Sequence, residues 1–241
     1  MTSPMRRTRS EELLLAKISA AAGREHLGKR HATYAGAAHT AHTKAPRTRG
    51  LRALPAFVRY GRRSAAKARD EARLDLYERG MTVAVQGRIH VVRYDTTSVF
   101  RMSTPDPPHD PARAGAACTL TDVDGKRIVL RGRPEHGDAA EWRSGIQRGV
   151  TRAQLPKAVA ALAEGERLAF GDIWLTREQV GCAEVCARWP RVRDLRIRKG
   201  AVELDIDGTW HGTGSRASEI PNLFVLRALV ELFHRDVNGR G

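Results

Sequence analysis

The feature that most constrains the fold of this chain is a series of short apolar–polar alternations that begins near residue 72. Every second position is apolar on both sides of Gly80, at Leu74, Leu76, Met81, Val83 and Val85. A period of two is typical of a half-buried β-strand, whereas an amphipathic helix repeats its apolar positions every three or four residues. The pattern therefore predicts strands with one face toward a core.

Turn and helix signals divide the rest of this region. Glycine follows a polar residue between strand-like runs, a pattern that favours tight hairpin turns, at Gln86-Gly87, Asp124-Gly125, Lys199-Gly200 and Asp207-Gly208. Apolar residues at helical spacing predict a helix over 142–150 and another that opens at Pro221-Asn222 and ends at 238. Thr151 and Gln154 have the spacing of a capping box, which predicts that a separate helix starts there and ends near Gly165.

Both halves of the region have strands, then an Asp-Gly hairpin, then a closing helix. The spacing of Tyr94, Thr97 and Phe100 is repeated by an equivalent trio, Trp189, Val192 and Leu195. Two stretches of similar length with one order of elements predict an internal duplication. The alternative is that two unrelated antiparallel meanders share a common layout.

Four segments carry a resemblance to a known type of protein. They are AGREHLGKRHATY (22–34), LYERGMTVAVQGRIHVVRY (76–94), GERLAFGDIWL (165–175) and EIPNLFVLRAL (219–229). They resemble a family of uncharacterised actinobacterial proteins with pleckstrin-homology-like (PH-like) domains. The resemblance covers most of residues 72–237. It implies an α+β fold of two tandem PH-like units, each an antiparallel β-sandwich or barrel capped by a C-terminal helix. It implies no enzymatic activity and supplies no functional residues.

The predicted organisation has five parts. Ser10-Glu11-Glu12 indicates the start of a short helix, and residues 35–50 contain almost no large apolar side chains, which is typical of a linker. We therefore predict a short helical N-terminal segment (1–34), a basic linker or arm (35–71), a first PH-like unit with closing helices (72–165), a second with one closing helix (166–237) and a tail (238–241).

The positive charge of the chain is concentrated before residue 70. The formal net charge is +15, from 42 Lys and Arg against 27 Asp and Glu. Residues 1–69 contain 16 basic and 3 acidic residues, whereas residues 70–241 contain 26 and 24. A basic arm on a nearly neutral body predicts an anionic partner for the arm. The candidate contact residues fall within one stretch free of acidic residues: Arg47, Arg49, Arg52, Arg59, Arg62, Arg63, Lys67 and Arg69.

Other motifs lack the residues that their chemistry needs. Gly125-Lys126 has neither the upstream glycine nor the following Ser or Thr of a phosphate-binding loop. Cys182 and Cys186 have no second ligand pair at zinc-site spacing, and Lys126 follows Asp122-Val123-Asp124-Gly125 where a calcium loop requires a further ligand. We therefore predict no catalytic residue, metal or cofactor. The four tryptophans are predicted to be core anchors.

These observations predict a non-enzymatic binding or adaptor protein whose basic arm contacts an anionic surface, either a membrane face or a protein. The alternative is a non-specific nucleic-acid-binding protein that uses the same arm, because Lys and Arg also neutralise phosphates. The sequence contains no stretch of about 18 apolar residues, so we predict no transmembrane helix. We predict a cytoplasmic location, with a peripheral position at the membrane if the arm binds lipid.

Overall fold

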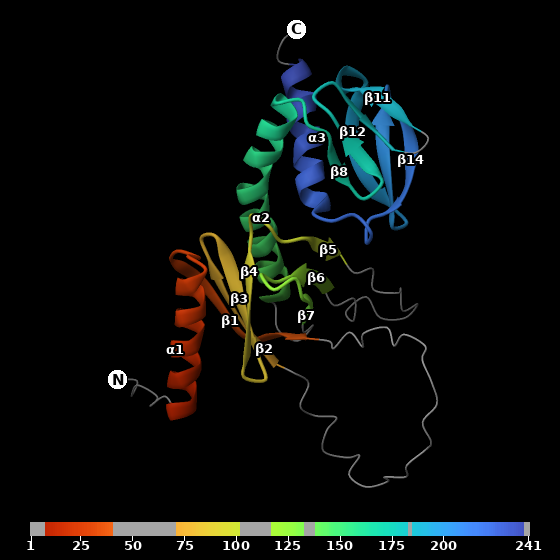
Figure 1. The fold of residues 1–241 in the computed structure, drawn as a ribbon. Helices are drawn as coiled ribbons and strands as arrows, with labels where there is room; N and C mark the ends of the chain where they lie inside the picture. Colours follow the sequence, from red (N-terminus) through yellow and green to blue (C-terminus); the bar gives the residue numbers. More distant parts are fainter. Residues whose placement is uncertain (1–7, 41–70, 102–116, 133–137, 183–184, 239–241) are drawn as a thin grey trace, which may run out of the picture.

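The computed structural model describes residues 8–40, 71–101, 117–132, 138–182 and 185–238. These residues form a mixed α+β fold with several antiparallel sheets and a C-terminal helix. Two units follow one another along the chain (Figure 1). The first unit comprises α1, β1–β7 and α2, and the second unit comprises β8–β14 and α3.

The first unit has seven strands between two helices. Its elements are α1 (Arg9–Arg24), β1 (Arg30–Thr40), β2 (Glu71–Tyr77), β3 (Gly80–Val85), β4 (Arg88–Arg93), β5 (Val99–Arg101), β6 (Ala117–Thr121), β7 (Arg127–Gly132) and α2 (Asp138–Ala163). The strands form one antiparallel sheet in the order β4-β3-β2-β1-β7-β6-β5. β1 therefore joins a four-stranded half to a three-stranded half.

The second unit repeats the order of seven strands followed by a helix, with shorter strands at its start. Its elements are β8 (Leu168–Phe170), β9 (Ile173–Leu175), β10 (Gln179–Gly181), β11 (Cys186–Arg188), a 3-10 turn η2 (Trp189–Arg191), β12 (Val192–Arg198), β13 (Ala201–Ile206), β14 (Thr209–Arg216) and α3 (Leu223–Asn238). Here the strands stay in two sheets, ordered β11-β10-β9-β8 and β12-β13-β14.

We predicted a helical segment up to residue 34 and a linker from residue 35. Both predictions are wrong for residues 30–40, which form the strand β1. This strand pairs with β2 from Arg30 to His39 and with β7 from Ala38 to Thr40, and its register shifts between Ala35 and Ala38. Small residues such as Ala and Gly do not produce the apolar–polar alternation by which a strand is predicted from sequence. They still supply backbone N–H and C=O groups, which two neighbouring strands pair here.

Helix α1 lies on the outer face of the first sheet, against β3 and β4 (Figure 1). Thr8 caps the helix together with Glu11 in a reciprocal capping box. A small apolar cluster under α1 contains Ala21, Ala22 and Leu27 with Tyr77 and Val91 of the sheet. Strand β3 is consequently buried along its whole length rather than on one face alone.

The two helices predicted on either side of Thr151 are a single helix, α2, of 26 residues. Gln154, which the capping-box pattern assigned to a helix start, instead donates hydrogen bonds from Nε2 to the backbone carbonyls of Tyr94 (2.8 Å) and Thr97 (2.9 Å). Its side chain is therefore used in a tertiary contact, and the helix continues through Pro156.

The units pack on each other through α2 and α3, which lie side by side (Figure 1). One cluster of buried apolar residues runs through both units. Trp142 of α2 and Trp189 of η2 are buried in it, as predicted, and Trp189 stacks on Phe233 with ring centroids 4.7 Å apart. Trp174 and Trp210 are only partly buried, and Arg167 and Arg196 lie over their rings.

Candidate functional site

All eight basic residues predicted to contact an anionic surface lie outside the described residues: Arg47, Arg49, Arg52, Arg59, Arg62, Arg63, Lys67 and Arg69. The structure does place the two ends of the segment that contains them. His39 pairs with Glu71 across β1 and β2, so residues 41–70 connect two neighbouring strands. The basic segment is therefore a long connection held at both ends by one sheet.

One hollow of the described residues lies where the two units meet and is lined by both. This cavity, which we call the junction cleft, has a volume of about 420 Å³. That volume is within the range of small-molecule and cofactor sites. Four segments form its walls: the β4–β5 connection (95–98), one face of α2 (154–161), strand β8 (168–170) and the start of α3 (221–225).

A buried hydrogen-bond network forms one side of the junction cleft. The Asn222 side chain accepts from the backbone N–H of Val99 (2.8 Å), and its Nδ2 donates to the Thr97 carbonyl (3.0 Å) and to Gln154 Oε1 (2.8 Å). The Asn222 backbone N–H also donates to the Val99 carbonyl at 2.9 Å. Asn222 therefore pairs with Val99 much as a neighbouring strand would, and fixes α3 to the first unit.

The local conformation of Asn222 explains why asparagine suits this position. Its φ is +49°, in the left-handed region that Asn tolerates better than most residues. The residue is also buried, and all its side-chain polar atoms have partners. The sequence showed Pro221-Asn222 only as a helix start. Its tertiary role had no local signal, because its partners lie 68 to 125 residues away.

Charged groups lie close to this network in the junction cleft, on the β4–β5 connection and on α2. The Asp95 carboxylate accepts from Arg93 Nε at 3.1 Å and from Lys157 Nζ at 3.2 Å. The hydrogen bond from Arg93 lowers the pKa of Asp95, and the bond from Lys157 adds to that effect, whereas partial burial opposes it. The carboxylate is thus held ionised between two cations, and the group as a whole carries one positive charge.

A second polar cluster lies between β1 and β2, under α1. Asp75 is fully buried, and it accepts hydrogen bonds from Thr33 Oγ1 (2.6 Å), Arg73 Nε (2.8 Å) and Arg30 Nη1 (3.3 Å). Burial alone would raise the pKa of Asp75, but the bonds from Arg73 and Thr33 and the two guanidinium charges lower it overall. Its oxygens are already bonded within the fold, so the cluster stabilises the sheet rather than offering a reactive group.

Arg30 also lines two shallow hollows beside α1, of about 530 and 420 Å³. Leu14 and Leu15 line one of them, and Leu13 on the same turn is exposed. The described residues show no segment over this surface.

His90 and Asp122 have the spacing of a catalytic His–Asp pair, with 2.8 Å between Nδ1 and Oδ2. The other Asp122 oxygen accepts from the backbone N–H groups of Lys126 (2.7 Å) and Asp124 (3.1 Å). This geometry closes the turn between β6 and β7. The pair therefore holds a hairpin, and the Asp122-Val123-Asp124-Gly125 motif is accounted for by that turn.

The three cysteines do not form a cluster. Cys118 is buried on β6 of the first sheet, and burial raises the pKa of its thiol to about 12. Cys182 is buried and Cys186 is exposed, with its thiol 3.3 Å from Gln179 Oε1. Within the described residues, no three His, Cys, Asp or Glu side chains are placed to hold a metal ion.

Comparison with known proteins assigns the chain to a family. The model of a family of unknown function, DUF6585, matches residues 67–238, and this protein therefore belongs to that family. The match begins just before β2, so α1 and β1 lie outside it. No curated protein sequence matches the chain. In the part of the chain that the structure describes, no helix has both the length and the apolar character needed to cross a bilayer.

Proposed function

We propose that the protein is a non-enzymatic binding or adaptor protein built from two PH-like units, with residues 41–70 contacting an anionic surface. The shared order of elements supports the PH-like assignment. Four antiparallel strands are followed by three more and then by a helix in each unit. Two units with one order, joined through a buried network at Asn222, favour a rigid body that displays a separate charged segment.

The observation that carries the proposal is the segregation of charge. Residues 1–69 have a net charge of +13 in a chain of +15. Each Lys or Arg near an anionic lipid surface contributes about 1 kcal/mol, so half of the eight clustered residues would give substantial binding. The interleaved Leu51, Leu54 and Phe57 are suited to a lipid interface, and this favours a membrane face over nucleic acid.

The architecture determines how this proposal is tested. Truncating the chain at residue 70 would also delete β1, which lies in the middle of the first sheet. The test variant is therefore the full chain with Gln at the eight arm positions. Its matched control loses eight exposed charges from the body, again by substitution to Gln, at Arg79, Arg88, Arg177, Arg188, Arg193, Arg198, Lys199 and Arg216.

Flotation with phosphatidylserine vesicles across a salt series measures the binding. We expect the wild type and the control variant to float at low salt and the arm variant to remain in the lower fractions. Equal flotation of the arm variant and the control would overturn the role of residues 41–70. Duplex DNA retardation under the same salt series tests the other anion. Retardation without flotation would replace the membrane proposal with nucleic-acid binding.

A further inference from the structure

Strand β8 has an open edge inside the junction cleft. Among the described residues it lies at the end of its sheet and pairs with β9 alone, in the register Leu168↔Leu175, Ala169↔Trp174 and Phe170↔Ile173. Gly171 and Asp172 form a two-residue turn between the strands, so Phe170 and Ile173 are a hydrogen-bonded pair. The N–H and C=O of Ala169 then point away from β9, toward the open edge.

The first unit shows what normally occupies such an edge. There the corresponding first strand, β1, pairs with β2 on one side and with β7 on the other. In the second unit, β8 does not pair with β14, the counterpart of β7. A side-chain hydrogen bond of 3.3 Å from Ser215 of β14 to Asp172, in the turn after β8, links these two sheets. Within the part of the chain that the structure describes, the second unit thus leaves unpaired the position that the first unit fills with backbone hydrogen bonds.

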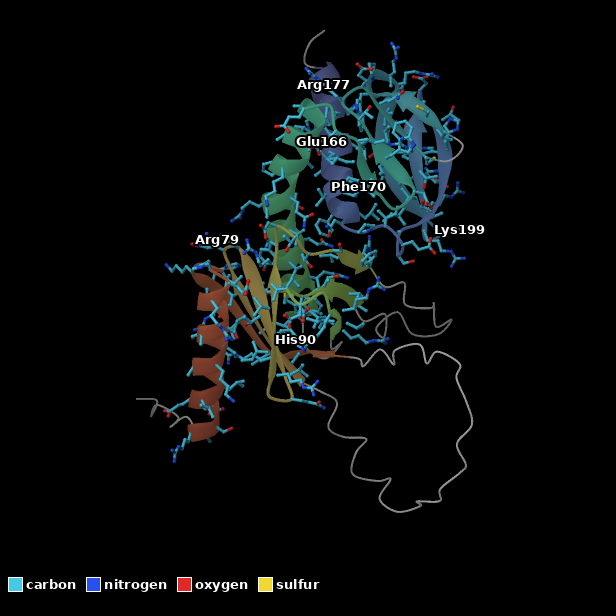
Figure 2. The ribbon with its side chains drawn as sticks, in the orientation of Figure 1. Arg79, His90, Glu166, Phe170, Arg177 and Lys199 are labelled. Carbon is cyan, nitrogen blue, oxygen red and sulfur yellow. The ribbon has the colours of Figure 1, made fainter. Side chains whose placement is uncertain are left out.

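The side chains around this edge define the chemistry of an occupant. Leu168 and Phe170 face the apolar interior of the unit on either side of Ala169, which is exposed. Val225 of α3 and Ala158 of α2 add apolar surface to the same cleft. Phe170 is labelled in Figure 2. Lys157 and Asp95 also line the cleft, and with Arg93, which bonds Asp95 from outside the lining, the group carries one net positive charge. An extended segment with alternating apolar and acidic side chains matches both the walls and the charge.

We propose that the junction cleft binds an extended peptide segment of a partner protein, which adds to β8 as an antiparallel or parallel strand. Main-chain hydrogen bonds to Ala169 supply the pairing, apolar side chains pack beside Leu168 and Phe170, and an acidic side chain lies beside Lys157. Strand addition to an exposed sheet edge is an established mode of peptide recognition. This proposal does not depend on residues 41–70.

One substitution isolates the backbone contact. Ala169→Pro removes the outward N–H, and proline is tolerated at an edge strand because that N–H faces away from the ladder. Ala169→Ser is the matched control, since it changes the side chain and retains the N–H. The probe is a phage-displayed library of random peptides selected on the full-length wild-type protein, followed by synthesis of an enriched peptide and titration against each variant.

We expect enriched peptides with alternating apolar and acidic positions. Their affinity should fall about tenfold in Ala169→Pro, the loss of roughly one hydrogen bond, and stay within about twofold in Ala169→Ser. Lys157→Glu should reduce affinity for acidic peptides and shift a fresh selection toward basic ones. Bound peptide should slow hydrogen exchange at the Ala169 amide of the wild type, a readout that needs no variant.

Three results would overturn the proposal. The first is a selection in which no peptide is enriched over an unrelated control protein. The second is equal affinity for the proline and serine variants, once thermal unfolding shows that both are folded. The third is a bound peptide that protects amides elsewhere but leaves Ala169 in fast exchange. Loss of vesicle binding in the arm variant, with peptide affinity intact, would show that the two proposals concern separate sites.

Discussion

The two units share an order of elements, but they differ in the strand that begins each of them. β1 has eleven residues and pairs on both sides, so the seven strands of the first unit form one sheet. β8 has three residues and pairs on one side, so the second unit remains two sheets. One length difference therefore decides whether the two halves of a unit are joined by backbone hydrogen bonds or by side-chain packing.

The local sequence explains the difference in length. β1 continues past a register shift between Ala35 and Ala38, where small residues let the strand bend from β2 toward β7. Only four residues separate the end of α2 at Ala163 from the start of β8, and the turn at Gly171, where φ is +63°, ends the strand. In place of a long first strand, the second unit relies on α3 and on apolar residues such as Ile220, which is fully buried.

The largest expected effect comes from removing β1. A fragment of residues 71–241 leaves the facing edges of β2 and β7 unpaired and takes Thr33 and Arg30 away from buried Asp75. Unpaired backbone groups and a stripped buried carboxylate are each costly, so we expect the first unit to lose its cooperative fold. Hydrogen exchange should show unprotected amides in β2–β7 and retained protection in β12–β14.

The control for this fragment keeps β1 and changes only the connection. It is the full chain with residues 41–70 replaced by a Gly/Ser segment of equal length. Its thermal unfolding midpoint should stay close to that of the wild type. A fragment 71–241 that unfolded at the wild-type midpoint would contradict the central role of β1. The family match begins at residue 67 and so does not include β1.

The next largest effect concerns the contact between the units. Asn222→Ala deletes three side-chain hydrogen bonds and leaves the Val99 N–H without its partner. Each unsatisfied buried group costs about 1–3 kcal/mol, so we expect a loss of about 3 kcal/mol in the free energy of unfolding. Asn222→Gly is the control for backbone strain, because glycine accepts the φ of +49°.

Calorimetry distinguishes the outcomes for Asn222. If the network couples the units, the wild type unfolds in one transition and both variants show two. A single transition with an unchanged midpoint in Asn222→Ala would mean that apolar packing between α2 and α3 holds the units together without these bonds.

A smaller effect, with a defined pH dependence, comes from Asp75. Folding lowers the pKa of this carboxyl, because bonds from Arg73 and Thr33 and nearby positive charge outweigh the opposing effect of burial. Its stabilising contribution is therefore complete above the unfolded pKa of about 4 and is lost as the pH falls through the lower folded value. Asp75→Asn should cost about 2 kcal/mol near neutral pH.

Urea unfolding across the acid range tests the sign of this dependence. The difference between wild type and Asp75→Asn should shrink as the pH falls below about 4. A difference that stays constant from neutral to acid pH would mean that the lost geometry, rather than the carboxylate charge, accounts for the cost. Lys126→Gln removes the exposed pair with Asp124 and serves as a surface control with little expected change.

The sequence predicted those parts of the fold that are encoded locally. The turns at Asp124-Gly125 and Asp207-Gly208 join β6 to β7 and β13 to β14, and the closing helix after Asn222 is α3. β1 was missed because Ala and Gly give no alternation, and its pairing partners lie about 30 to 95 residues ahead. The helix boundary expected at Thr151 was wrong: α2 continues through this position, and Gln154 bonds backbone carbonyls of the β4–β5 region rather than a helix start.

The junction cleft lacked a sequence signal for the same reason. Thr97, Gln154 and Asn222 are ordinary polar residues in separate elements, and only the packing of the two units brings them together. The open edge of β8 is likewise a property of the sheet order rather than of Leu168–Phe170 itself. A single sequence can reveal the strands that form a site of this kind. It does not reveal which of those strands keeps an unpaired edge, and the proposed site depends on that edge.

The smallest predicted effect compares the closing helices of the two units. α2 carries Gly145 and Gly149 against Leu76 and Tyr94, and a Cβ at Gly149 would overlap the Tyr94 ring. Glycine to alanine in a helix normally stabilises by about 1 kcal/mol, whereas overpacking a core costs about 1–3 kcal/mol. We therefore expect Gly149→Ala to destabilise by about 1 kcal/mol, measured by chemical denaturation.

Helix α3 has no glycine between Leu223 and Asn238 and packs on the core with larger side chains such as Leu226 and Leu229. Ala228→Gly in α3 should therefore cost about 1 kcal/mol through helix propensity. Glycine to alanine is thus expected to destabilise α2, and alanine to glycine to destabilise α3. Arg148→Ala, at the exposed neighbour of Gly149, controls for α2. A Gly149→Ala variant more stable than wild type would show that the Tyr94 ring can move aside, and that close packing of helix on sheet does not distinguish the first unit from the second.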